Sequence, residues 1–116
     1  MSTELIDLRD ELRAFAQARD WDKFHSPKNL ASALAVEAAE LLEPFQWLTE
    51  EQSRHLSPEQ LRAVQDEMAD VLIYLIRLSD KLDVDLIAAV RDKIAHNAAK
   101  YPVNKVRGSS RKYTEL

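Results

Sequence analysis

The chain has 116 residues, of which 46% are hydrophobic and 31% are charged, and its formal net charge is −4. This length suits a single domain with its own core, and the composition is too apolar for a disordered chain. The one glycine, Gly108, excludes glycine-rich phosphate loops and argues against sheet folds with many tight turns. Because the sequence has no cysteine, disulfides, thiol catalysis and thiolate zinc sites are also excluded.

The charge is distributed unevenly along the chain. Residues 1–99 carry 11 basic and 19 acidic side chains, whereas residues 100–116 carry five basic and one acidic, a net charge of +4. We therefore expect a helical domain over residues 1–100 and a basic C-terminal tail over 101–116. An acidic body argues against nucleic acid as a partner, because binding phosphates needs a basic face.

The sequence gives no sign of a membrane or of secretion. No apolar run approaches the roughly 20 residues that a membrane span needs. The first residues, Met1 to Leu5, lack the basic and then apolar pattern of a signal peptide. The expectation is a cytoplasmic protein with no membrane partner.

Four segments have the apolar spacing of amphipathic helices. The first is predicted from about Thr3 to Arg19. The second begins at Ser26-Pro27, a capping residue followed by a first-turn proline, and runs toward Pro44, which ends or kinks it.

The third segment has the clearest start of the four. Ser57-Pro58 supplies a cap and a first-turn proline, and Gln60 occupies the capping-box position. The pattern predicts a helix that continues to about Lys81, a length of roughly 37 Å at 1.5 Å per residue.

The fourth helix is predicted over about Leu86–Lys100, after a cap at Asp83 or Asp85 and before Pro102. Four helices with short connections in about 100 residues indicate an all-α, four-helix-bundle type of domain.

The third helix is apolar around most of its circumference between residues 68 and 78. A helix of that kind is buried on nearly all sides. Because a domain this small has little interior to cover it, we expect a homo-oligomer that associates through its helices.

Two pairs of carboxylates interrupt the apolar helices. Glu37 and Glu40 lie three residues apart on the second helix, and Glu67 and Asp70 lie three apart on the third. Residues at this spacing share one helix face. Packing the two helices together would bring all four carboxylates to one place.

Four like charges in an apolar surrounding repel one another unless some are protonated or a cation neutralises them. Oxygen ligands suit magnesium, calcium and manganese. The lack of cysteine and the three histidines, none of them beside these carboxylates, argue against zinc and against a ferritin-like di-iron site. The residues alone thus indicate a metal-binding helical domain that handles phosphate.

At these carboxylates the chain resembles the all-α nucleoside triphosphate pyrophosphohydrolases of the MazG-like superfamily, whose pattern is Glu-Glu-x-x-Glu, a spacer and Glu-x-x-Asp. Val36 stands where many members have the first glutamate, which leaves a four-carboxylate site intact. The resemblance is closest to the dCTP pyrophosphatase branch and covers nearly the whole chain. It rests on residues 19–21 (RDW), 24–30 (FHSPKNL), 45–47 (FQW), 70–75 (DVLIYL) and 109–116 (SSRKYTEL).

This resemblance implies hydrolysis of a deoxynucleoside triphosphate, dCTP or a modified dCTP, to the monophosphate and pyrophosphate, as in nucleotide-pool sanitation. It also implies Mg²⁺, with Mn²⁺ as a substitute, held by Glu37, Glu40, Glu67 and Asp70. Either Glu37 or Glu40 would orient or deprotonate the attacking water as the catalytic residue, and the sequence does not choose between them.

Nine further side chains are expected to bind the substrate. Trp21 and Trp47 follow helices and are suited to stacking on a base, and Tyr74 lies one turn after Asp70, where it can border the sugar. The resemblance implies that Lys93 and Asn97 contact the phosphates. The full set is Trp21, His25, Trp47, Tyr74, Lys93, Asn97, Lys100, Arg111 and Lys112.

Alternatives remain open from the sequence. The substrate could be dUTP, a non-standard purine triphosphate or phosphoribosyl-ATP, or the chain could be a non-catalytic helical oligomer. The branch that it resembles favours a tetramer over a dimer.

Overall fold

The computed structural model describes residues 2–115. Its elements in chain order are the helices and 3₁₀ turns α1 (Thr3–Ala18), η1 (Asp22–Phe24), α2 (Pro27–Leu42), α3 (Glu50–Ser53), α4 (Pro58–Leu82), α5 (Leu86–Lys100), α6 (Val103–Val106) and η2 (Tyr113–Glu115). No strand occurs among these residues, so the all-α class is confirmed. The four long helices coincide with the four predicted ones, while α3, α6 and the two 3₁₀ turns were not predicted.

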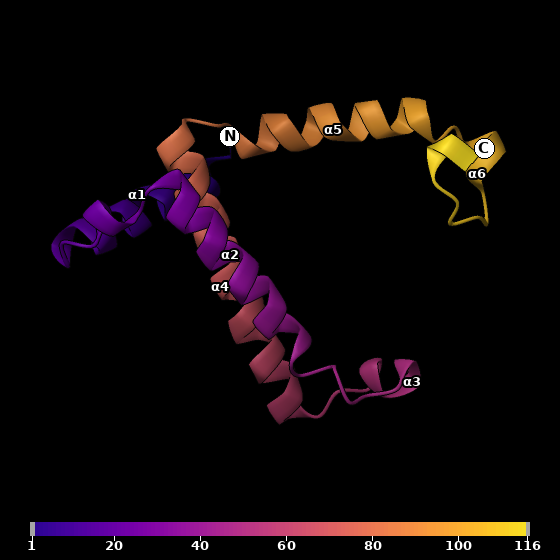
Figure 1. Cartoon of the computed structure of the whole chain (residues 1–116), viewed down its shortest axis with the longest axis horizontal. Helices are drawn as coiled ribbons and strands as arrows, with labels where there is room; N and C mark the ends of the chain where they lie inside the picture. The colour runs from indigo at the N-terminus through magenta and orange to yellow at the C-terminus, as the bar shows by residue number, and fades with distance from the viewer. Residues whose placement is uncertain (1, 116) are drawn as a thin grey trace. The chain divides into compact units, whose positions relative to one another are not determined.

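The chain divides into two compact units, one over Ser2–Val84 and one that begins at Asp85. In the first unit, α2 and α4 run antiparallel and side by side, and α1 packs against α4 (Figure 1). The most deeply buried apolar residues are Ala16, Leu30, Val64 and Ile76, one each from α1 and α2 and two from α4. The α2–α4 pair is therefore the frame on which the site is built.

The start of α4 is fixed by two reciprocal hydrogen bonds. The Gln60 amide N–H donates to Ser57 Oγ over 3.2 Å, and the Ser57 N–H donates to Gln60 Oε1 over 2.8 Å. Pro58 follows the cap, where its missing N–H leaves no bond unmade. At the other end Asp83, with φ of 54°, ends the helix in the left-handed conformation.

The second unit begins at the Asp85 cap, whose carboxylate accepts from the Ala88 amide over 3.1 Å. At its far end the Tyr113 ring stands edge-on to Tyr101, with 6.1 Å between ring centroids, and the Lys100 ammonium lies 4.6 Å from the Tyr113 centroid. The basic tail therefore folds back on the end of α5 within this unit.

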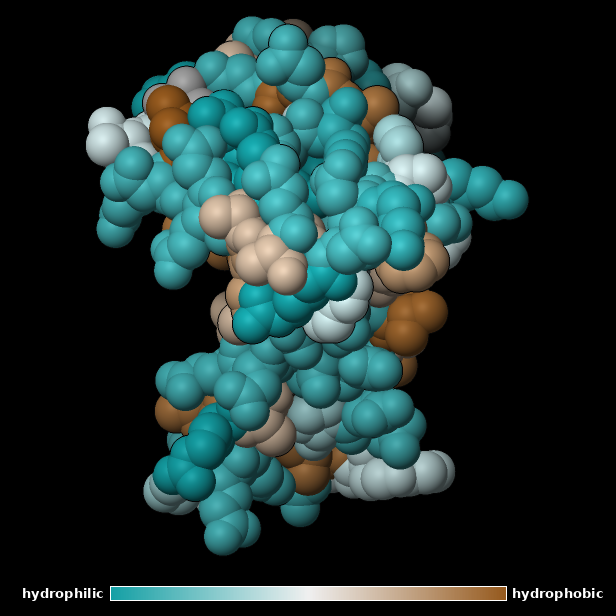
Figure 2. Space-filling model, turned by 90° about the vertical axis from the view of Figure 1, so that its left-hand side faces the viewer, coloured by the Kyte–Doolittle hydropathy of each residue, from teal (hydrophilic) through white to brown (hydrophobic). Residues whose placement is uncertain are grey.

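Large apolar side chains reach the surface of the described chain at many positions, and Figure 2 displays them as brown patches among hydrophilic residues. One group belongs to the first unit, where α1 and α4 leave a groove of about 610 Å³ between them. Among residues 2–115, no helix is both long and apolar enough to cross a membrane.

The capping box of α4 predicts a measurable loss of stability. Replacing Ser57 with alanine should lower the free energy of unfolding by about 1 kcal/mol, because the Gln60 amide loses its acceptor. Thermal unfolding followed by circular dichroism should show the midpoint falling by about 4 °C. Ser32→Ala is the matched control, since the Ser32 hydroxyl only donates to a carbonyl within α2, that of Lys28. Equal midpoints for the two variants would contradict the role of the cap.

Candidate functional site

Three carboxylates meet where α2 and α4 pack together. Glu37 of α2 and Glu67 and Asp70 of α4 each offer one oxygen, and the three oxygens lie within 4.8 Å of one another. Glu67 and Asp70 share a face of α4 because they are three residues apart, and the neighbouring α2 brings Glu37 to that face. All three residues are half-buried.

The fourth predicted carboxylate, Glu40, lies one turn after Glu37 and is also half-buried. Its side chain hydrogen-bonds Glu37, and its charge acts on both Glu37 and Glu67. The helix pair therefore brings all four carboxylates to one place, with three of them in a single set of ligand atoms. Glu43, one further turn along, adds its negative charge at Glu67, and the sequence analysis missed it.

The carboxylates are crowded and incompletely bonded. Burial, followed by the hydrogen bond and charge of Glu40, raises the pKa of Glu37 to about 7. Burial and the charges of Glu40 and Asp70 also raise the pKa of Glu67. Among the described residues, the buried oxygens Glu37 Oε2 and Glu67 Oε2 have no hydrogen-bond partner.

These observations test whether a cation fits the donor set. Unpaired, buried carboxylate oxygens are costly, and several negative charges at one place disfavour one another. A hard divalent cation with oxygen ligands removes both penalties. The residues present therefore fit such an ion, and Glu37, Glu67 and Asp70 would be its ligands, with Glu40 beside them.

A pocket of about 290 Å³ adjoins this cluster and shares Asp70 with it. Three predicted substrate-binding residues, Trp21, His25 and Tyr74, line the same pocket. The other lining residues are Leu12, Phe15, Ala16, Ile73 and Arg77, none of which was predicted to bind substrate. The apolar residues among them have the spacing of ordinary core positions, so the sequence contains no signal of a binding role for them.

The chain reaches this pocket through the way in which α1 ends. Asp20 adopts the left-handed conformation with φ of 55°, its N–H donates to the Gln17 carbonyl over 3.1 Å, and the Trp21 N–H donates to the Ala16 carbonyl over 2.9 Å. This pair of bonds is a Schellman motif, with aspartate where glycine is usual. It turns the chain so that Trp21 lies edge-on to Phe15, with 5.8 Å between ring centroids.

The remaining predicted site residues are not brought into this pocket by the described contacts. Trp47 lies in the segment between α2 and α3, and its side chain is 88% exposed. Lys93, Asn97, Lys100, Arg111 and Lys112 all belong to the unit that begins at Asp85. Their contact with a substrate stays a prediction.

The fold and the carboxylate cluster define an all-α protein with a candidate cation site beside an aromatic-lined pocket, and known proteins are similar to it. The MazG-like family model matches residues 33–116. The protein named dCTP pyrophosphatase 1 from Homo sapiens is 46% identical over 114 residues, which are 97% of this chain and 67% of that protein. Its namesake from Bos taurus is 45% identical over 114 residues, 97% of this chain and 68% of that protein.

A solved structure agrees with the sequence relatives. The crystal structure of a pyrophosphatase from Archaeoglobus fulgidus matches with a TM-score of 0.82 and 41% sequence identity, covering 88% of this chain and 95% of that one. The chain thus belongs to the MazG-like family.

The raised pKa of Glu37 predicts how stability depends on pH in the metal-free protein. The folded state holds the Glu37 proton up to about pH 7, whereas an unfolded glutamate releases it near pH 4.3. The folded state therefore binds more protons between these values, and this group's contribution to stability is lost as pH rises through the window.

Glu37→Gln isolates this contribution, because glutamine does not titrate. Chemical unfolding in a chelator at pH 5 to 8 should show the variant gaining stability over the original chain as the pH rises. A difference between the two proteins that is constant with pH would contradict the crowding at Glu37.

Proposed function

We propose that this chain hydrolyses a deoxynucleoside triphosphate, most readily dCTP or a modified dCTP, to the monophosphate and pyrophosphate. The reaction uses Mg²⁺, for which Mn²⁺ can substitute. The observation that carries the proposal is the sharing of Asp70 between the carboxylate cluster and the pocket of Trp21, His25 and Tyr74. A nucleotide is a flat base joined to a phosphate chain, so it needs an aromatic-lined pocket beside a cation site. The family and the names of its relatives support the same enzyme class, a nucleoside triphosphate pyrophosphohydrolase.

The carboxylates have two roles in this proposal. Glu37, Glu40, Glu67 and Asp70 hold the divalent cation, which when bound supplies charge neutralisation at the phosphoryl oxygens and a lowered pKa for coordinated water. Glu37 or Glu40 orients the attacking water and accepts its proton, while the bond between the α- and β-phosphates is cleaved.

The pocket holds the base and the sugar. Trp21 is 45% exposed and supported edge-on by Phe15, so its free face is available for stacking, worth about 1–3 kcal/mol per base. Tyr74 lies one turn after Asp70 on α4 and borders the deoxyribose, where a 2′-hydroxyl would clash. Trp47 supplies a second aromatic surface from its exposed position.

The phosphates need positive charge as well as a cation, because the chain has no phosphate loop. Lys93 and Asn97 lie four residues apart on one exposed face of α5. We propose that Lys100, Arg111 and Lys112 bind the triphosphate as well, which gives the basic tail over 101–116 a role in addition to that of the helical domain over 1–100.

The test is pyrophosphate release from dCTP with Mg²⁺. Glu40→Gln and Asp70→Asn should each lower kcat by about 100-fold or more, since cation stabilisation of the reaction is worth several kcal/mol. Asp66→Asn is the matched control, because Asp66 is an exposed carboxylate of the same helix outside the cluster. Circular dichroism should show unchanged helicity in all three variants.

The competing hypotheses give different outcomes in the same assay. A substrate panel of dCTP, dUTP, a non-standard purine triphosphate and phosphoribosyl-ATP should place dCTP first in kcat/KM. Full turnover in the Asp70→Asn variant would contradict the assignment of the carboxylate cluster as the active site. A non-catalytic oligomer would release no pyrophosphate from any of the four, and nucleotide with Mg²⁺ would leave its melting temperature unchanged.

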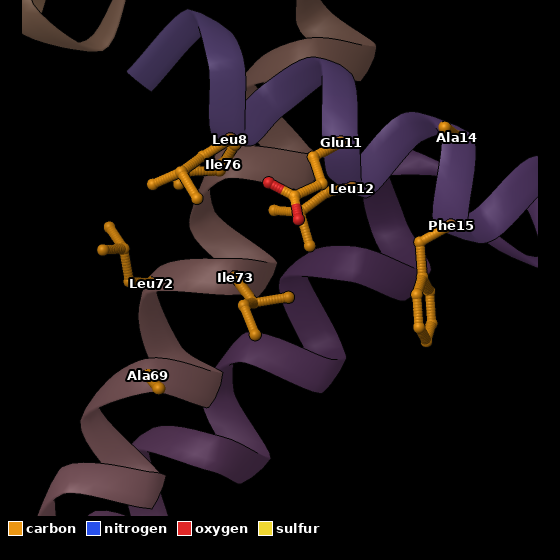
Figure 3. Close-up of a pocket in the computed structure, with 9 residues that line it drawn as sticks. All are labelled: Leu8, Glu11, Leu12, Ala14, Phe15, Ala69, Leu72, Ile73 and Ile76. Atoms are coloured by element: carbon orange, nitrogen blue, oxygen red, sulfur yellow. The ribbon is translucent and has the colours of Figure 1, made fainter. Parts of the chain in front are cut away.

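The groove between α1 and α4 supports a homo-oligomer, and the resemblance to the dCTP pyrophosphatase branch favours a tetramer. Its apolar lining comes from both helices, including Leu8 and Phe15 of α1 and Leu72 and Ile73 of α4, all of them at least 37% exposed (Figure 3). Contiguous exposed apolar surface of this kind marks an interface.

The cytoplasmic location expected from the sequence stays a prediction.

The oligomer is tested by light scattering after size-exclusion chromatography. Leu72→Glu should lower the mass of the assembly, because a carboxylate would be desolvated at the interface. Leu61→Glu changes a leucine of α4 with similar exposure that lies outside the groove, and it should leave the mass unchanged. A monomeric original chain, or equal masses for the two variants, would contradict association through this groove.

A further inference from the structure

Arg77 of α4 is a charged residue with only 3% of its surface exposed, and its guanidinium contacts three groups. Its Nη2 lies 3.0 Å from Asp22 Oδ1, and its Nη1 lies 3.3 Å from Asp80 Oδ2. The same group donates to Nδ1 of His25, over 3.3 Å from Nε and 3.1 Å from Nη2. Arg77 therefore joins an ion-pair network to a histidine that lines the proposed base pocket.

The chemistry of the two side chains fixes where the His25 proton is. A guanidinium has only N–H donors and no acceptor, so the Nδ1 atom that it contacts must carry the lone pair. A neutral imidazole has one N–H, which is then at Nε2. Burial and the positive charges of Arg77 and Lys81 lower the pKa of His25, although the negative charge of Asp22 opposes them. The lowered pKa favours the neutral ring.

The other cations of the network do not contact His25. Lys81 donates to Asp22 Oδ1 over 2.6 Å, and Arg13 Nε donates to Asp80 Oδ2 over 3.0 Å. Each carboxylate thus has a second cation besides Arg77. Within the described residues, Arg77 is the cation of this network that hydrogen-bonds the imidazole.

The Nε2 atom is left available to a ligand. His25 shares the pocket of about 290 Å³ with Trp21 and Tyr74. Among residues 2–115, Nε2 has no hydrogen-bond partner, while Nδ1 is held by Arg77. The imidazole that lines the pocket therefore carries its single N–H on Nε2, in addition to the N–H donors of Trp21 and Arg77, which line the same pocket.

We propose that Arg77 is a positioning residue that locks His25 as an Nε2–H donor, and that this donor selects cytosine over uracil in the base pocket. The selection follows from base chemistry, because N3 of cytosine is an acceptor whereas N3 of uracil carries a hydrogen. An N–H donor that faces N3 forms a hydrogen bond with cytosine, whereas with uracil two N–H groups face each other and no hydrogen bond forms. This inference rests on the proposed function for the identity of the ligand, but the tautomer of His25 is independent of it.

The first test is the tautomer itself, read from long-range ¹H–¹⁵N spectra of the ligand-free chain at neutral pH, in which protonated and unprotonated ring nitrogens are well separated. The original chain should show His25 protonated at Nε2 alone. Arg77→Met should show a mixture of both tautomers, because Nδ1 has lost its donors. Arg13→Met is the matched control, since it removes a cation of the same network without touching His25, and it should keep the pure Nε2–H form.

A His25 protonated at Nδ1 in the original chain overturns the proposal, and this reading needs no variant to fold. A pure Nε2–H form that persists in Arg77→Met also overturns the role of Arg77.

The second test is base selection in binding, measured by calorimetry with dCMP and dUMP so that no turnover is needed. The original chain and Arg13→Met should bind dCMP about tenfold more tightly than dUMP, and Arg77→Met should lose most of that ratio. Equal affinity for the two nucleotides in the original chain, including the absence of measurable binding, overturns the selection by His25. Failure of the proposed function is seen separately, as no pyrophosphate release from dCTP in a chain whose His25 tautomer is as expected.

Discussion

The packing of α2 against α4 forces carboxylates together in a half-buried place, and the rest of the site depends on that constraint. Glu37, Glu67 and Asp70 have oxygens within 4.8 Å of one another, and Glu40 adds its charge to theirs. The protein without a cation meets this repulsion in part by holding a proton on Glu37 up to about pH 7. A helix pair that brought these residues together only for stability would do better with apolar side chains. The cluster therefore has an excess of negative charge that a bound cation would neutralise.

A second constraint is the course of the chain between α1 and α2. Asp20 in the left-handed conformation places Trp21, and the Ser26 cap starts α2, so the loop between them is held at both ends. Arg77 ties its middle to α4 through Asp22 and His25. Asp70 and Tyr74 lie on the same helix as Arg77, so α4 contributes to both the carboxylate cluster and the pocket. The remaining members come from α2 for the cluster, and from α1 and the loop after it for the pocket.

Helix boundaries were predictable from the sequence because their signals are local. Ser57, Pro58 and Gln60 define the start of α4 within four residues, and the structure has the reciprocal hydrogen bonds that this pattern predicts. The four carboxylates were predictable because two three-residue spacings in apolar helices mark one shared face. The contacts of Arg77 with His25 and Asp22 were not predictable, since these partners lie 52 and 55 residues away in the sequence and no local spacing pairs them. Nor could spacing alone identify Leu12, Phe15 and Ile73 as pocket residues, because the same apolar stripe also builds the core.

We propose above that the α2–α4 carboxylates bind a divalent cation in place of protons. Calorimetric titration of Mg²⁺ into the chain with bound nucleotide product, in buffers of different ionisation enthalpy, counts the protons released on binding. We predict proton release at pH 6.5 that declines toward zero at pH 8.5, because Glu37 is then already ionised. Glu37→Gln should bind the cation more weakly and release fewer protons at pH 6.5. Binding of unchanged strength in Glu37→Gln, or proton release that does not vary with pH, would contradict the claim.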